Sequence, residues 1–203
     1  MTTPLEKLYL QDPDPVAYAR GYLRRLAALL EALDPAAIAR ATEAIWRARE
    51  EGRKILFIGN GGSAATASHF ANDIGIGTRS AGAPFKALAL TDNNAVMTAI
   101  ANDSGYDQVF VQQLEMHLEP GDVLIAISAS GNSPNVVKAV ELARERGNTV
   151  IGLTGFDGGE LGRRSHIHVH APTEKGEYGP VEDVHMILDH LMSSFLAMRA
   201  RAR

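Results

Sequence analysis

Five short runs of apolar residues limit most strongly what this chain can fold into. The runs span residues 54–58, 86–90, 123–128, 149–153 and 166–170, and each has the length of a β-strand. ILFI and VLIAI are apolar at every position, which is typical of strands buried on both faces, as in a parallel sheet. Most of the intervals between runs are long enough for a helical crossover. The pattern predicts an α/β domain with a doubly wound, five-stranded parallel sheet.

Helical patterns flank these five runs. Apolar residues recur at helical spacing between Tyr18 and Leu33, and Asp34 followed by Pro35 predicts the N-cap and first turn of a second helix that ends near residue 51. A long helix is predicted over about residues 181–198. We therefore expect an N-terminal helical pair before the sheet and a long C-terminal helix after it.

The last predicted helix has a broad apolar surface. Its main stripe is Val184, Leu188, Leu191, Phe195 and Met198, and off this stripe lie Val181, Met192 and Leu196. A helix with so broad an apolar surface is usually covered by more than its own domain. We favour an oligomer interface here, with a core helix of irregular packing as the alternative.

The composition excludes several classes of protein. The chain has 203 residues, which suits one domain over residues 1–203, and it contains no cysteine. A disulfide scaffold, a thiol nucleophile and a thiolate metal site are excluded, so any metal must bind through imidazole and oxygen. The formal net charge of -4 gives no electrostatic footprint for nucleic acid. Without a visible targeting segment or an apolar segment that could span a bilayer, a cytoplasmic protein with no membrane partner is expected.

A glycine-rich loop follows the first predicted strand. Gly59, Gly61 and Gly62 allow positive φ and close approach of a ligand, and Ser63 supplies a hydroxyl where a helix begins with unpaired N–H groups. This chemistry suits an anion. The loop lacks the Gly-Lys-Ser/Thr of a P-loop and the glycine spacing of a dinucleotide fingerprint. Taken alone, it is as well explained by a tight strand-to-helix turn.

A second loop of the same kind follows the third predicted strand. Ser128, Ser130 and Ser133 surround a glycine at another helix start, and three hydroxyls with backbone N–H groups can hold a phosphate without a lysine. Both loops lie at the carboxyl ends of strands, where open α/β sheets bind ligands. The pair favours a phosphorylated ligand, although helix capping alone would explain Ser133.

Four segments, in order along the chain, carry a family resemblance. They are GNGGSAATASHFA at residues 59–71, the AxxND pattern at 99–103, ISASGNSPNVVKA at 127–139 and LTGFDGGELG at 153–162. Over about residues 17–196 the chain resembles the sugar isomerase (SIS) domain, in the branch of the phosphoheptose isomerases. The resemblance implies a five-stranded parallel sheet and a homotetramer with sites between subunits. It also implies a sugar phosphate held by the loop that carries Ser128, Ser130 and Ser133, which we call the serine loop. Residues 1–51 are then expected to pack on the domain and on partner subunits.

Histidines and carboxylates on two predicted helices could supply an acid, a base and metal ligands. His69 and Asp73 are four residues apart and share a helix face, although such a pair is often only a surface contact. Helical periodicity places Asp183 and His190 of the last helix on one face, with Glu182 as a neighbour.

The resemblance implies roles for four of these residues. In phosphoheptose isomerases, the position of Asp73 is a glutamate that acts as base, and that of His190 is a histidine that acts as acid. Members that bind zinc use these two positions with those of His69 and Glu182. The candidate catalytic residues are therefore Asp73 and His190, and the candidate metal ligands are His69, Asp73, Glu182 and His190. This nitrogen and oxygen set suits zinc first, with manganese, nickel or iron as alternatives.

Two of the four residues depart from the family pattern. Asp73 is one methylene shorter than the family's glutamate, which shortens its reach to the substrate. Glu182 replaces a glutamine, and its carboxylate should hold a divalent cation more tightly but repel an anionic substrate.

The resemblance also implies the substrate contacts. The loop at residues 60–62 would contact the sugar end, Asn102 and Asp103 its hydroxyls, and the serine loop the phosphate. The full candidate substrate-binding set is Asn60, Gly61, Gly62, Ser63, Asp73, Asn102, Asp103, Ser128, Ala129, Ser130, Ser133 and Glu182.

The predicted reaction is an aldose–ketose isomerisation by metal-assisted proton transfer through an enediol. The resemblance makes sedoheptulose 7-phosphate the expected substrate and D-glycero-D-manno-heptose 7-phosphate the product. The two departures leave an isomerase of another ketose phosphate open. A further alternative is a non-catalytic phosphosugar-binding SIS protein that associates with the bacterial replication initiator. Such a relative lacks the acid and base, whereas Asp73 and His190 are both present here.

The remaining histidines are not expected to form a site. His166, His168 and His170 alternate along the fifth predicted strand, and although they look like a metal stripe, we expect them on a solvated face at the sheet edge. His185 points away from the other polar residues of the last helix, which favours a packing or interface role.

Overall fold

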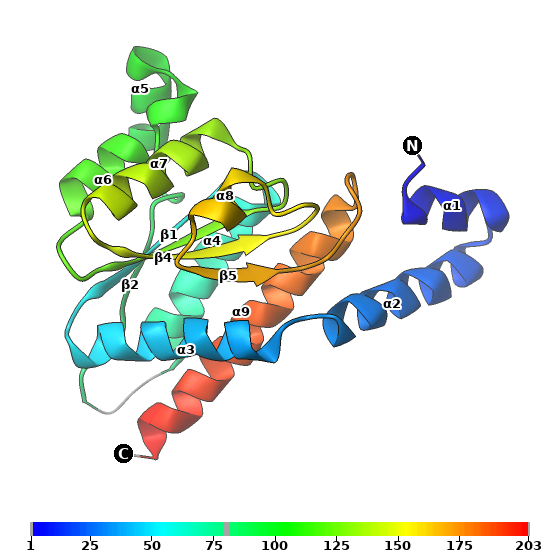
Figure 1. Cartoon of the computed structure of the whole chain (residues 1–203), viewed down its shortest axis with the longest axis horizontal. Coiled ribbons are helices and arrows are strands. Elements are labelled where there is room, and N and C mark those ends of the chain that lie inside the picture. Colours follow the sequence, from blue (N-terminus) through cyan, green and yellow to red (C-terminus); the bar gives the residue numbers. More distant parts are fainter. Residues whose placement is uncertain (1, 79–81, 203) are drawn as a thin grey trace.

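A five-stranded, all-parallel sheet forms the centre of the computed structural model, which describes residues 2–78 and 82–202 (Figure 1). Its strand order is β2-β1-β3-β4-β5, and each neighbouring pair is parallel. The strands are β1 (Lys54–Gly59), β2 (Lys86–Ala89), β3 (Val123–Ser128), β4 (Thr149–Thr154) and β5 (Ile167–His170). The predicted doubly wound sheet and its five strands are confirmed.

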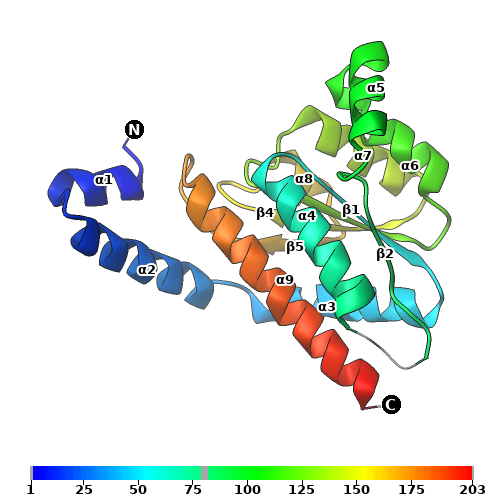
Figure 2. The same ribbon diagram turned by 180° about the vertical axis from the view of Figure 1, so that it is seen from behind.

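Helices cover both faces of this sheet. On one side lie α3 (Pro35–Glu50), α4 (Gly62–Asn72), the π-helical turn η1 (Asp73–Gly77) and α9 (Tyr178–Arg201). On the other lie α5 (Asn94–Ser104), the 3₁₀ turn η2 (Tyr106–Gln108), α6 (Val111–His117), α7 (Pro134–Glu145) and α8 (Gly159–Arg164). Figures 1 and 2 show α1 (Pro4–Gln11) and α2 (Pro15–Glu31) extending away from the sheet.

Side chains of the central strands alternate between two cores. Ile55 and Phe57 belong to the core with α3, α4 and α9, whereas Leu56 and Ile58 belong to the core with α5 to α8. All four side chains are completely buried, which explains why this run is apolar at every position. The Phe57 ring lies 5.1 Å from that of Phe70, so β1 and α4 are packed directly together.

The strand order brings the two glycine-rich loops together. The chain runs from β1 outward to β2 and then returns to place β3, β4 and β5 on the other side of β1. The carboxyl ends of β1 and β3 therefore flank the switch point, where open α/β sheets bind their ligands. The loops after these two strands are those that the sequence marks for an anion.

The first helix was not expected from the sequence. Thr3 caps α1: the Glu6 N–H donates to Thr3 Oγ1 at 3.2 Å, and the Thr3 N–H donates to Glu6 Oε2 at 2.7 Å. With Pro4 in the first turn, this is a complete capping box. Its T-x-x-E signature is short and precedes few apolar residues, so hydrophobic periodicity alone does not detect it.

Helix α2 is attached to the start of α9 by polar contacts. Arg25 binds the buried Glu177 carboxylate through Nε at 3.0 Å and Nη2 at 2.7 Å, and the Tyr22 hydroxyl donates to Asp183. Burial alone would raise the pKa of Glu177, but the hydrogen bonds from Arg25 and from the Glu174 N–H, together with the Arg25 charge, lower it. These contacts orient the end of α9 that carries Glu182. Packing of residues 1–51 on partner subunits stays a prediction.

Helix α9 divides its apolar residues differently from the predicted stripe. Those that enter the core are Val181, Val184, Leu188, Met192 and Leu196. Leu191, Phe195 and Met198 remain 46%, 46% and 61% exposed. The core of the chain therefore takes up only Val184 and Leu188 of the predicted stripe, because a 3.6-residue repeat turns that line of residues gradually out of the core. The oligomer interface stays a prediction.

The expectation of a solvated histidine face on β5 was partly wrong. His166 is exposed, but His168 and His170 are half-buried. Thr154 Oγ1 of the neighbouring strand lies 2.6 Å from His168 Nε2 and 3.0 Å from His170 Nδ1. Burial lowers the pKa of both rings, so β5 presents neutral, hydrogen-bonded imidazoles at the sheet edge.

His185 lies in the core beneath β4. It is completely buried, its Nε2 is 3.2 Å from the Thr154 carbonyl oxygen, and its Nδ1 has no partner in the described part of the chain. Burial, and to a smaller degree the nearby His170, lower its pKa to about 4 against the opposing hydrogen bond to Thr154. The structure thus gives His185 a packing role.

Acid should destabilise the fold through His185. The pKa of His185 in the folded protein is below the ordinary 6.5. Its contribution to the unfolding free energy is therefore fully present above pH 6.5 and is lost as the pH drops toward 4. Between pH 7 and pH 4 we expect the chain to lose about 3 kcal/mol of unfolding free energy that His185→Gln does not lose. Urea unfolding of both proteins at the two pH values measures this, because titrations common to both cancel. Equal losses in the two proteins would contradict it.

The turn after β3 requires glycine. Gly131 has φ +64°, and a Cβ there would lie 2.1 Å from the Gly158 carbonyl oxygen. Gly147 has φ +75° but open space around it, so it serves as the matched control. We expect Gly131→Ala to lower the unfolding free energy by about 2 kcal/mol more than Gly147→Ala. Chemical denaturation of both variants tests this, and a similar loss in each would show that the contact with Gly158 does not matter.

Candidate active site

A polar pocket lies at the carboxyl ends of β1 and β3, and we call it the serine pocket. It is lined by Asn60, Ser63, Ile127, Ser128, Ala129, Ser130, Ser133, Tyr178 and Glu182. The structure therefore brings residues of both glycine-rich loops to one place, together with Glu182 of α9. Tyr178, the first residue of α9, was not expected there. Its ring packs edge-on against that of Phe156, with the two ring centroids 5.1 Å apart.

Two helices begin at the serine pocket without a side-chain cap. The N-cap of α4 is Gly61, with φ +55°, and that of α7 is Ser133; neither makes a side-chain capping hydrogen bond. Capping therefore does not explain Ser133, although serine at this position usually caps. Uncapped helix starts present N–H groups and the positive end of the helix dipole, which suits an anion.

The serine hydroxyls converge at this point. Ser128 Oγ lies 3.4 Å from Ser133 Oγ and accepts the Gly131 N–H at 3.2 Å. Ser130 Oγ accepts the Asn132 N–H at 3.2 Å. These hydroxyls can also donate their protons to an anion, which fits a phosphate held without a positively charged side chain.

A paired amide contact joins the two loops. Asn60 and Asn135 exchange hydrogen bonds between their side chains, both at 2.9 Å, and the Tyr106 hydroxyl donates to Asn60 Oδ1 at 3.0 Å. Asn60 is thus engaged in holding α7 beside α4. Asn135 was missed from the sequence, although its place directly after Ser-Pro at a helix start was a signal.

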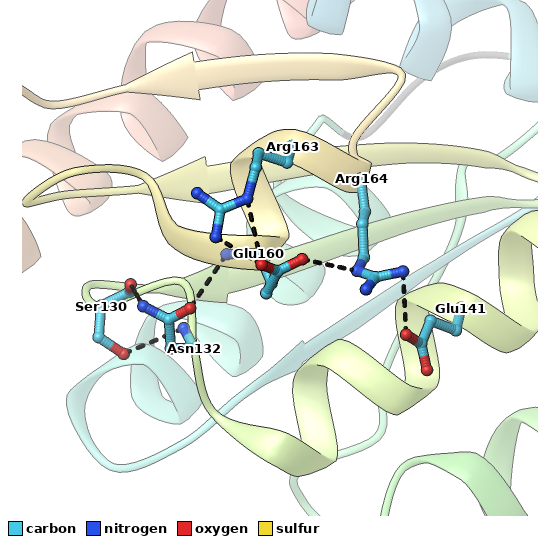
Figure 3. A network of polar contacts seen from close by, with 6 residues as sticks. All are labelled: Ser130, Asn132, Glu141, Glu160, Arg163 and Arg164. Carbon is cyan, nitrogen blue, oxygen red and sulfur yellow. Dashed lines mark hydrogen bonds and ion pairs between the residues drawn. The ribbon is translucent and has the colours of Figure 1, made fainter.

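A polar network fixes the other side of the serine loop, as Figure 3 shows. Asn132 Nδ2 donates to the Ser130 carbonyl oxygen at 2.9 Å, and Asn132 Oδ1 accepts the Glu160 N–H of α8 at 3.1 Å. The Glu160 carboxylate binds Arg163 and Arg164, and Arg164 also pairs with Glu141 of α7 at 2.9 Å. The loop conformation is therefore tied to both α7 and α8.

A second polar group, which we call the His/Asp cluster, lies between α4 and α9. Its members are His69, Asp73, Asp189 and His190, and their ligand atoms all lie within 4.8 Å of one another. His69 Nε2 is 3.2 Å from His190 Nε2 and 3.5 Å from Asp73 Oδ2. Asp73 begins the π-helical turn, a feature often found at functional sites. Two imidazoles and two carboxylates this close can hold a divalent metal ion.

Asp189 was missed from the sequence. It is completely buried, neither carboxylate oxygen has a hydrogen-bond partner among the described residues, and Oδ2 lies 4.0 Å from His69 Nε2. Burial, and then the nearby Asp73, raise its pKa to about 8. Its position directly before His190 was the available signal, but helical periodicity drew attention to Asp183, which instead binds Tyr22.

Glu182 lies in the serine pocket and outside the His/Asp cluster. Its carboxylate fills the space beside Gly62, where a Cβ would come within 2.3 Å of Oε2. Burial, and then Asp183, raise its pKa. Eight residues separate Glu182 from His190 on α9, a rise of about 12 Å along the helix. One chain therefore places these two predicted ligands at separate points.

Two predicted substrate residues lie apart from both groups. Asn102 and Asp103 are exposed near the end of α5, where the Asn102 amide donates to the Asp103 carboxylate at 2.7 Å. Neither lines the serine pocket or joins the His/Asp cluster in the described part of the chain. Their role in binding the sugar stays a prediction.

Known proteins resemble this chain in sequence and in structure. Residues 17–155 match the model of the SIS domain family. A phosphoheptose isomerase of Rhodospirillum rubrum is 41% identical over 77% of this chain and 82% of that protein. Phosphoheptose isomerase structures from Neisseria gonorrhoeae and Francisella tularensis each align with a TM-score of 0.80. The alignment with the Neisseria structure has 35% sequence identity and covers 92% of this chain and 98% of that chain. The alignment with the Francisella structure has 30% identity and covers 90% of this chain and 95% of that chain. The chain belongs to the SIS domain family, among the phosphoheptose isomerases.

Proposed function

We propose that this protein isomerises sedoheptulose 7-phosphate to D-glycero-D-manno-heptose 7-phosphate. The observation that carries the proposal is that one chain combines a pocket for an anion with a cluster of carboxylate and imidazole groups. Phosphate binding and proton transfer are the two tasks that such a reaction requires. Similarity to phosphoheptose isomerases supports the choice of substrate.

The serine pocket would bind the phosphate. The hydroxyls of Ser128, Ser130 and Ser133, with the uncapped starts of α4 and α7, offer donors without a lysine or arginine. Glu182 shares this pocket, and in its ionised form it would oppose the phosphate charge. Burial, and then Asp183, raise the pKa of Glu182, so its carboxyl group loses its charge at a higher pH than an exposed glutamate does.

The His/Asp cluster would move the protons. Asp73, as a carboxylate, would remove the proton from the carbon next to the carbonyl group, and His190 would donate a proton to the carbonyl oxygen, which gives an enediol. The enediol then takes up a proton at the former carbonyl carbon. It loses the hydroxyl proton on the carbon that Asp73 deprotonated, which completes the isomerisation. His69, 3.2 Å from His190, would keep that ring in place.

A divalent metal ion, with zinc as the first candidate, fits this cluster. The test is the buried Asp189 carboxylate, which has no other partner among the described residues. The residues that would hold the ion include His69, Asp73 and His190. When bound, such an ion polarises carbonyl and hydroxyl oxygens and makes the neighbouring C–H proton easier to remove.

The site would be completed in a homotetramer. In one chain the serine pocket and the His/Asp cluster are about two to three helical turns apart on α9. A neighbouring subunit could bring its own groups closer to the serine pocket. The exposed Leu191, Phe195 and Met198, beside a groove formed with Ile38 of α3, supply an apolar surface for such contacts.

Another ketose phosphate is the second candidate substrate. Asp73 is shorter than the family's glutamate, and Glu182 adds a carboxylate to the serine pocket. The first change shortens the reach of the carboxylate toward the substrate, and the second changes the charge that the substrate meets. No helix in the described part of the chain is long and apolar enough to cross a bilayer. A cytoplasmic location and the lack of nucleic-acid binding stay predictions.

Asp73→Asn should lower kcat for sedoheptulose 7-phosphate by about 10²–10⁴-fold, because the amide cannot accept the proton. The matched control is Asp107→Asn, an exposed carboxylate that pairs with Lys138 on the surface. Product formation is followed with the metal-free protein, after metal is added back, and with a panel of ketose phosphates. Full activity of Asp73→Asn would remove Asp73 from the mechanism, and no product from the wild type with any metal would refute the proposed substrate.

Phe195→Glu should convert the tetramer to smaller species. The substitution places a charge on the outward face of α9, where burial against another subunit would leave it unpaired. Met116→Glu, on the exposed face of α6, is the control and should leave the mass unchanged. Light scattering coupled to size exclusion gives the masses. A Phe195→Glu protein that remains tetrameric would place the interface elsewhere.

A further inference from the structure

A buried carboxylate without a partner needs an explanation. Asp189 has no exposed surface, and neither of its oxygens accepts a hydrogen bond in the described part of the chain. Buried polar side chains are almost always satisfied, and burying an unpaired carboxylate opposes folding. Asp189 directly follows the core residue Leu188 in the sequence of α9, yet its side chain is acidic.

The Asp189 carboxylate points toward the two histidines. Its Oδ2 lies 4.0 Å from His69 Nε2, and the same nitrogen is 3.2 Å from His190 Nε2 and 3.5 Å from Asp73 Oδ2. Ligands of a tetrahedral ion with bonds of 2.0–2.1 Å are about 3.4 Å apart. The three separations around His69 are therefore already close to those of a metal site.

We infer that Asp189 is a ligand of the divalent ion in this chain, with His69, Asp73 and His190. The inference rests on the proposed function, because it concerns the ion proposed there. In one chain, Asp189 would occupy the place that the family resemblance gives to Glu182. Two neutral imidazoles and two carboxylates would balance the charge of a divalent cation.

The position of Glu182 supports this assignment. Its carboxylate lies against Gly62 at the start of α4, whereas His69 lies seven residues further along the same helix. On α9, Glu182 is about 12 Å from His190 along the helix axis. The Glu182 carboxylate of one chain therefore cannot join its own His/Asp cluster without a large rearrangement of two packed helices.

The length of Asp73 is consistent with a second carboxylate. Asp73 and Asp189 reach the cluster from different elements, one from η1 and the other from α9. Both are aspartates, and the ligand atoms of the cluster already lie within 4.8 Å of one another with these short side chains. A glutamate at position 73 would extend one methylene further into the same space.

Zinc titration of the metal-free protein tests the inference. Isothermal calorimetry compares the wild type with Asp189→Asn and with the matched control Asp107→Asn, which removes an exposed carboxylate. We expect Asp189→Asn to weaken Zn²⁺ binding at least about tenfold, since even indirect supporting residues contribute 10–100-fold. Asp107→Asn should bind as the wild type does, because Asp107 lies outside the His/Asp cluster. Unchanged binding by Asp189→Asn, or an equal loss in Asp107→Asn, would overturn the inference.

Thermal unfolding of the metal-free variants separates ligation from a structural role. Because Asp189 makes no hydrogen bond to lose, metal-free Asp189→Asn should melt at or above the wild-type temperature, and the stabilisation that Zn²⁺ gives the wild type should be lost. A lower melting temperature without metal, with the zinc stabilisation retained, would indicate a structural role and refute ligation.

A crystal structure of the Co²⁺-loaded wild type provides a test that needs no variant. Anomalous scattering should place the ion with an Asp189 oxygen at about 2.0–2.2 Å. A Glu182 oxygen from any subunit in that place would refute the inference. These measurements use no substrate, so an inactive protein that binds Zn²⁺ through Asp189 would refute the proposed reaction and leave the ligand assignment standing.

Discussion

The packing of α4 against both the sheet and α9 is the contact on which the rest of the site depends. Phe70 of α4 packs against Phe57 of β1, and α9 lies beside α4 on the same face of the sheet, as Figure 2 shows. Helix α4 begins at the serine pocket and carries His69 two turns later. Because a helix rises 1.5 Å per residue, the packing of these two helices sets the distance between the serine pocket and the His/Asp cluster.

The electrostatics of the site come mainly from backbone and neutral groups. The serine pocket contains no lysine or arginine, and its donors are hydroxyls and the N–H groups of two uncapped helix starts. The charged side chains there and in the His/Asp cluster are carboxylates and imidazoles. A site of this kind suits an anion, because oriented dipoles can hold it while the titratable groups stay free to move protons.

Several details were beyond prediction from sequence for physical reasons. The two glycine-rich loops could be predicted because the effect of glycine and serine between a strand and a helix depends only on neighbouring residues. Asp189 was missed because a buried carboxylate looks like a surface residue until the partner helix is placed. Leu191 and Phe195 were assigned to one stripe with Leu188, but the boundary between core and surface depends on how α3 crosses α9. His168 and His170 were expected in solvent, whereas Thr154 of the adjacent strand binds both rings.

The sequence by itself determined the parallel sheet, the two glycine-rich loops at its carboxyl edge and the restriction of any metal ligands to nitrogen and oxygen atoms. These follow from local patterns: apolar runs, glycine at strand ends, and the absence of cysteine. Only the tertiary structure decided which carboxylates meet the histidines. That depends on the rotation of α9 against α4, which turns Asp189 inward beside His69 and leaves Glu182 at the start of α4. Such a rotation is set by the packing of many buried side chains, and no local pattern encodes it.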